Sequence, residues 1–159
     1  MKRVNKLQKT IMDLIQKNID YNKQEVNRLE SEINSFKSKA LKSNASEKNN
    51  IKKIQLKTYI EGGISALEAV LEYSKSLKQD SEHKLVLIIG AAILDNLESV
   101  KRYNEMIANE PETSDDSIAQ KMFHRTYIAG GLSALGELLD YIATLLNVKL
   151  EDIDVPPVR

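Results

Sequence analysis

Residues 57–73 (KTYIEGGISALEAVLEY) and residues 125–141 (RTYIAGGLSALGELLDY) are two copies of one sequence motif. Ten of the 17 aligned positions are identical, whereas two unrelated stretches of this length would share about one residue. The copies are 68 residues apart (126 − 58 = 68). The chain is therefore an internal duplication, and each repeat contains one copy of the motif.

The rest of the chain predicts helices on both sides of these motifs. Only 3 prolines and 6 glycines interrupt a sequence that is 42% hydrophobic and 29% charged, and this composition favours helix. Asn44 and Glu47 have the spacing of a capping box before the second helix. We expect four helices: the first over residues 2–42, the second after a break at 43–47 and ending at 78, the third over 82–108, and the fourth after a loop at 109–116 and ending at 147.

The fold class that follows is all-α, a duplicated helical hairpin with a long N-terminal helix. The simplest closure of two such hairpins is a four-helix bundle-like domain with a pseudo-twofold axis. We expect one domain, residues 1–147, built from repeats at 1–78 and 79–147, with a short C-terminal tail at 148–159. The 68-residue offset would also superpose the first helix on the third, pairing Ile19 with Leu87 and Val26 with Leu94.

Charge is distributed unevenly along the sequence, although the net charge is zero. Residues 1–57 hold 14 Lys/Arg and 6 Asp/Glu (14 − 6 = +8), and residues 58–159 hold 9 and 17 (9 − 17 = −8). Three interpretations are open: a solvated surface, complementary contact between halves or subunits, and a basic surface for phosphate-bearing ligands. Because the first helix also has a narrow apolar seam, we expect a homo-oligomer.

Several classes of chemistry lack their residues in this sequence. There are no cysteines and two histidines, which form no metal-binding pair, and the glycine pairs lie within helical periodicity rather than in a phosphate loop. We therefore expect no enzyme activity, no metal and no cofactor. The most apolar run, Leu85 to Leu94, is half the length of a membrane span. We interpret it as a buried helix of a soluble, cytoplasmic protein.

Candidate ligand-binding residues lie within and just before the repeated motif. Each copy offers a cation and a hydroxyl, which together can hold a phosphate oxygen, and a tyrosine, which can stack on a base. The structural alternatives are a threonine bonded to the preceding turn, a tyrosine at the edge of the core and a solvated cation. The glycine pairs allow either close packing of the two motif helices or close approach of a ligand. The candidates are Lys57, Thr58, Tyr59, Gly62, Gly63, His124, Arg125, Thr126, Tyr127, Gly130 and Gly131.

The motif helix resembles one in a family of small phage proteins, the anti-CBASS and anti-Thoeris sponges, which sequester nucleotide second messengers of bacterial immunity. The first copy matches that pattern at Ile54, Lys57, Thr58, Ile60, Gly63, Ile64, Ala66 and Leu67. The second copy matches at Arg125, Thr126, Ile128, Gly131, Leu132, Ala134 and Leu135, with Met122 in place of the isoleucine. This chain has Glu68 and Gly136 where the family has an arginine, and two hairpins where the family has one.

The resemblance implies a non-catalytic helical oligomer that binds a cyclic oligonucleotide or an ADP-ribose derivative between hairpins, in the cytoplasm of a bacterial host. The leading hypothesis is therefore a nucleotide sponge, with Lys57, Thr58, Arg125 and Thr126 on phosphates and both tyrosines on bases. The alternative is a helical protein-interaction module that inhibits or scaffolds a host protein. A nucleic-acid binder ranks third, because no recognition motif accompanies the basic residues.

Overall fold

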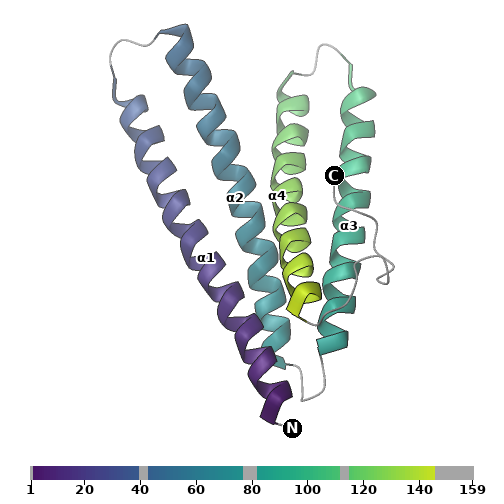
Figure 1. Ribbon diagram of the computed structural model, residues 1–159. Coiled ribbons are helices and arrows are strands. Elements are labelled where there is room, and N and C mark those ends of the chain that lie inside the picture. Colours follow the sequence, from purple (N-terminus) through teal and green to yellow (C-terminus); the bar gives the residue numbers. More distant parts are fainter. Residues whose placement is uncertain (1, 40–42, 77–81, 112–114, 146–159) are drawn as a thin grey trace.

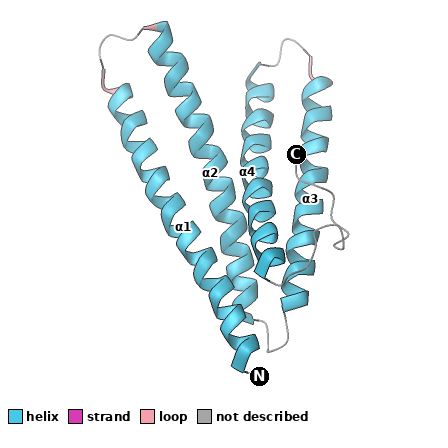
Figure 2. Cartoon of the chain, in the orientation of Figure 1, coloured by secondary structure: helices cyan, strands magenta, loops and turns pink. Residues whose placement is uncertain are grey.

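The computed structural model describes residues 2–39, 43–76, 82–111 and 115–145, with side chains from residue 8 and, in the third segment, from residue 84. These segments form four helices and no strand: α1 (Lys2–Lys37), α2 (Asn44–Ser76), α3 (Glu82–Ala108) and α4 (Asp115–Leu145) (Figures 1 and 2). The all-α prediction is confirmed. The tail at 148–159 lies outside the described residues.

Two features next to the first hairpin loop differ from the sequence prediction, namely the end of α1 and the cap of α2. α1 ends at Lys37 rather than at residue 42. At this end the backbone forms a tighter turn, because the Lys39 amide donates to the Phe36 carbonyl, three residues back (3.2 Å). The capping box of α2 is formed by Ser43 and Ser46 rather than by Asn44 and Glu47. Each of these serine amides donates to the other serine's hydroxyl, at 3.0 and 3.1 Å.

The four helices lie in the spatial order α1, α2, α4, α3 (Figure 1). α2 packs most extensively on α4 in the centre, while α1 covers α2 and α3 covers α4 on the outside. The two hairpins diverge toward their loops, so that the molecule has the outline of a V with two arms (Figure 1). The molecule is thus a bundle at one end and two separate helix pairs at the other.

The hydrophobic core lies at the closed end of the V. It joins the first half of α1 and of α3 to the second half of α2 and of α4. Burial of each such side chain contributes about 1.5–3 kcal/mol to folding. Its members with least exposure are Ile11, Ile15, Ile19, Leu85, Ile89, Ile93, Leu135 and Ile142.

The two outer helices correspond with a different offset from the one that relates the motifs. Three buried residues with the same spacing, Ile11, Ile15 and Ile19, match Leu85, Ile89 and Ile93, which are 74 residues later (85 − 11 = 74). The predicted pairing of Ile19 with Leu87 is wrong, because Ile19 is 1% exposed and Leu87 is 68% exposed. Since the motifs keep an offset of 68, the second hairpin is six residues shorter around its loop (74 − 68 = 6).

The glycine pairs form the crossing point of α2 and α4. A Cβ atom at Gly62 would lie 1.8 Å from the carbonyl oxygen of Tyr127, and one at Gly130 would lie 1.7 Å from that of Tyr59. Both contacts obey the 68-residue offset, so the crossing is pseudo-symmetric. Only glycine permits two backbones to approach this closely. Close packing of the two motif helices, one of the two interpretations of these glycines, is what the structure contains.

One helix of the described segments, α4, is long and apolar enough by length and composition to cross a bilayer. Of the 18-residue window that meets this criterion, 44% is buried inside the molecule. Core helices of soluble proteins meet the same criterion, so this finding is weak evidence for a membrane span.

Candidate functional site

A cavity that brings together candidate residues from both motifs lies between the arms of the V, just above the helix crossing. We call it the inter-arm cavity. Its volume is about 660 Å³, within the range of small-molecule sites. Both copies of the motif contribute, because Thr58 and Tyr59 face Arg125 and Thr126 across it. Its remaining wall is largely apolar and consists of Ile51, Ile54, Gln55, Leu56, Ala119, Met122 and Phe123.

The two threonines use their hydroxyl protons within their own helices. Thr58 Oγ1 donates to the Ile54 carbonyl at 3.0 Å, and Thr126 Oγ1 donates to the Met122 carbonyl at 2.9 Å. The structure thus contains the bond to the preceding turn that was the structural alternative. In this state each threonine oxygen can accept a hydrogen bond from a ligand but cannot donate one to a phosphate.

The two motif cations have different surroundings, although they occupy matched positions. Lys57 Nζ lies 3.3 Å from a Glu61 carboxylate oxygen and 3.9 Å from one of Glu30, so its charge is compensated. Arg125 Nη1 donates to the amide oxygen of Asn104 at 2.9 Å. An amide carries no charge, and among the described residues no carboxylate pairs with Arg125. Arg125 lines the inter-arm cavity and Lys57 does not.

The two motif tyrosines line different cavities. Tyr59, which is exposed, faces the inter-arm cavity. Tyr127 is half-buried and lines a second cavity of about 410 Å³ between α2, α3 and α4, together with Gly62 and Gly131. The structure therefore does not bring both tyrosines to one ligand position.

The remaining candidates lie in contacts between helices or beside α3. Gly63 and Gly130 are buried where α2 and α4 meet, and a Cβ on Gly63 would lie 3.3 Å from the Ala134 methyl. The His124 ring stacks on Tyr103 of α3, with ring centroids 6.0 Å apart. Of the eleven predicted residues, four meet in the inter-arm cavity.

Known proteins add nothing to this geometry. No protein-family model, curated protein or solved structure matches this chain.

Sequence reasoning missed most of the apolar wall of the inter-arm cavity. Ile51 and Ile54 precede Thr58 by seven and four residues, and Ala119 and Met122 precede Thr126 by the same distances. This spacing places them on the same helix face as the threonines, on the side toward the hairpin loops. The signal was present in the duplication, but periodicity alone does not tell a cavity wall from a packed core.

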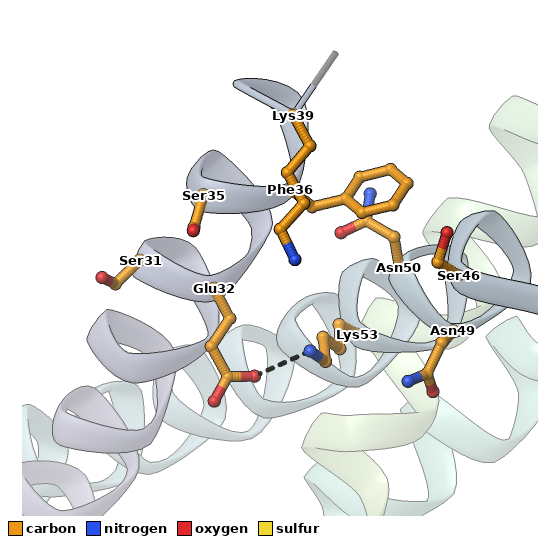
Figure 3. Close-up of a pocket in the computed structure, with 9 residues that line it drawn as sticks. All are labelled: Ser31, Glu32, Ser35, Phe36, Lys39, Ser46, Asn49, Asn50 and Lys53. Atoms are coloured by element: carbon orange, nitrogen blue, oxygen red, sulfur yellow. Dashed lines mark ion pairs between the residues drawn. The ribbon is translucent and has the colours of Figure 1, made fainter. Parts of the chain in front are cut away.

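A separate polar pocket of about 420 Å³ lies between α1 and α2 near the tip of the first hairpin (Figure 3). On one side Lys53 Nζ pairs with Glu32 at 3.1 Å, and this hydrogen bond lowers the pKa of Glu32. On the other side the Asn50 amide lies near the Phe36 ring (Figure 3). Among the residues that the structure describes, the buried Asn50 side-chain oxygen has no hydrogen-bond partner.

The matched tip of the second hairpin is built differently. The position that matches Asn50 holds Ile118 (50 + 68 = 118). There Lys121 donates to both Glu110 and Ser117, and its hydrogen bond lowers the pKa of Glu110. The second tip thus has an apolar residue at the position where the first has Asn50, whereas the matched lysines, Lys53 and Lys121, pair with a glutamate in both tips.

We expect Asn50→Ile to raise the free energy of unfolding by about 1 kcal/mol, because it removes an unpaired buried acceptor. The matched control is Asn49→Ile, which makes the same chemical change at an exposed position and should have an effect near zero. Urea denaturation followed by circular dichroism measures both. A loss of stability in the Asn50 variant would show that this amide is bonded in solution.

Proposed function

We propose that this chain is a non-catalytic binding protein that sequesters a small nucleotide messenger in the inter-arm cavity. The observation that carries the proposal is the convergence of both motif copies on one cavity, which is lined by Tyr59 and by Arg125, a cation with no paired carboxylate among the described residues. An anion and an aromatic base joined in one ligand match these two groups.

The ligand roles differ from those expected from the sequence. Arg125 holds the anionic group, since Lys57 is already paired with glutamates. Tyr59 and Phe123, both exposed at the cavity, offer ring faces for stacking. Thr58 and Thr126 accept hydrogen bonds from donors on the ligand instead of holding phosphate.

Calorimetric titration of the purified chain with cyclic di- and trinucleotides, cyclic ADP-ribose isomers and linear ADP-ribose tests the proposal. We expect one member of this panel to bind, with an affinity that falls as salt increases because one contact is ionic. The non-cyclic parent nucleotides serve as controls for nonspecific anion binding. The absence of binding by every cyclic ligand and every ADP-ribose derivative would refute the sponge function.

The apolar wall favours a second candidate, a helical protein-interaction module. Four of its exposed apolar side chains, Ile51, Ile54, Met122 and Phe123, could receive the apolar face of a partner helix. A pulldown from bacterial lysate that retains one protein in stoichiometric amount, with no heat from the nucleotide panel, would support this candidate over the sponge.

A further inference from the structure

The outward faces of α1 and α3 have opposite chemistry at matched positions. In α1 this face holds Asp13, Lys17 and Asp20, all exposed. Their counterparts 74 residues later in α3 are Leu87, Ala91 and Leu94, and these are exposed as well. Leu87 is 68% exposed and Leu94 is 44% exposed. The same place in the fold is charged in one hairpin and apolar in the other, so solvation alone does not account for the face of α3.

The three apolar residues have the spacing of a helix-packing seam. They follow one another at intervals of four and three residues, which keeps them on one side of a helix. Lys84 and Glu98 continue the same face, since each lies seven residues, about two turns, from Ala91 in opposite directions. Both are exposed, and neither is in an ion pair among the described residues. The seam is therefore apolar in its middle, with opposite charges at its two ends.

This arrangement is complementary to a second copy of itself. In an antiparallel pair of α3 helices that cross at Ala91, Lys84 of each copy lies opposite Glu98 of the other. The small Ala91 side chains permit close approach at the centre, with leucines on both sides of it. A parallel pair would instead place lysine against lysine and glutamate against glutamate. The charges therefore favour a second copy of α3 as the partner and an antiparallel orientation of the two helices.

We propose that the chain forms a twofold-symmetric homodimer through this face of α3, with the two α3 helices antiparallel. The dimer extends the row of helices beyond α3. It leaves the inter-arm cavity open, because α2 and α4 line that cavity. The proposal thus goes beyond the ligand-binding function and does not depend on it.

Sedimentation equilibrium of the full chain over concentrations up to about 100 µM tests the dimer. We expect a mass of twice 18.0 kDa for the wild type. Lys84→Glu and Glu98→Lys should each weaken dimerisation by about tenfold, and the double variant should restore it to near the wild-type value. Leu87→Asp, which copies the residue at Asp13 in α1, should give a monomer, while Asp13→Lys should leave the dimer unchanged.

Circular dichroism of every variant confirms that the helices remain folded. A monomeric wild type would overturn the proposal, as would a Leu87→Asp variant that keeps the wild-type mass. The antiparallel arrangement would be overturned if each single variant is folded and dimerises more weakly but the double variant does not restore dimerisation.

Discussion

Gly62→Ala is expected to lower the free energy of unfolding by about 2–4 kcal/mol, because the added methyl cannot fit at the helix crossing. Its Cβ would lie 1.8 Å from the Tyr127 carbonyl oxygen, which belongs to a helix backbone and not to a flexible side chain. α2 and α4 must therefore move apart, and the packing below the crossing is lost with them. Gly130→Ala should have an equal effect, since its contact with Tyr59 is the symmetric one.

Gly63→Ala is the matched control for this prediction. Its Cβ would meet the Ala134 methyl and the Gly130 carbonyl oxygen at 3.3 Å, a contact that a small shift accommodates. Alanine also gains up to about 1 kcal/mol of helix propensity over glycine. The net change should thus stay within about 1 kcal/mol. Urea denaturation compares the variants, and equal losses at Gly62 and Gly63 would contradict the crossing geometry.

Arg125→Met is expected to weaken binding of the nucleotide ligand by about 10- to 100-fold. It removes the cation that lines the inter-arm cavity, and a charge-assisted hydrogen bond contributes about 1.5–3 kcal/mol. Methionine keeps most of the side-chain volume, so the contacts of the helices should persist. Calorimetry with the ligand found in the nucleotide panel measures the change.

Lys57→Met is the control at the matched position of the first motif. Lys57 is held by Glu61 and Glu30 and does not line the cavity, so its removal should change the affinity by less than about threefold. If Lys57→Met weakened binding as much as Arg125→Met, the anionic group of the ligand would have to lie toward α1. That result would contradict the assignment of Arg125.

The sequence predicted the helices and the relation of the two motifs, because both depend on local pattern. α3 has the predicted bounds, Glu82–Ala108. The α2 cap was misplaced by one residue, since Asn44 and Ser43 are both good caps and only the geometry shows that Ser43 pairs with Ser46. The end of α1 is predicted too late, because Ser38 and Lys39 are compatible both with a helix interior and with a helix terminus.

The register of the outer helices could not be predicted from the motif offset. The two hairpins differ by six residues around their loops, and a one-sided apolar pattern allows several alignments of α1 with α3. Only burial decides among them. With the 74-residue offset exposed Leu87 matches exposed Asp13, whereas the motif offset would match it with buried Ile19.

The candidate site could be predicted in part. The motif pointed to Arg125 and Tyr59, which do line the inter-arm cavity. The opposite surroundings of Lys57 and Arg125 depend on Glu30 and Asn104, which lie on other helices and are invisible in the motif itself. Tyr59 and Tyr127 occupy matched positions of the motif but line different cavities, which the repeated sequence does not predict.

The central claim is that the two motif copies build one binding site rather than two. The stoichiometry of the calorimetric titration tests this most directly, because the inter-arm cavity lies between the motifs and each chain has one such cavity among its described residues. We expect one ligand per chain, whether the chain is a monomer or a dimer through α3. Two ligands per chain, one for each motif, or no binding of any nucleotide in the panel, would contradict the claim.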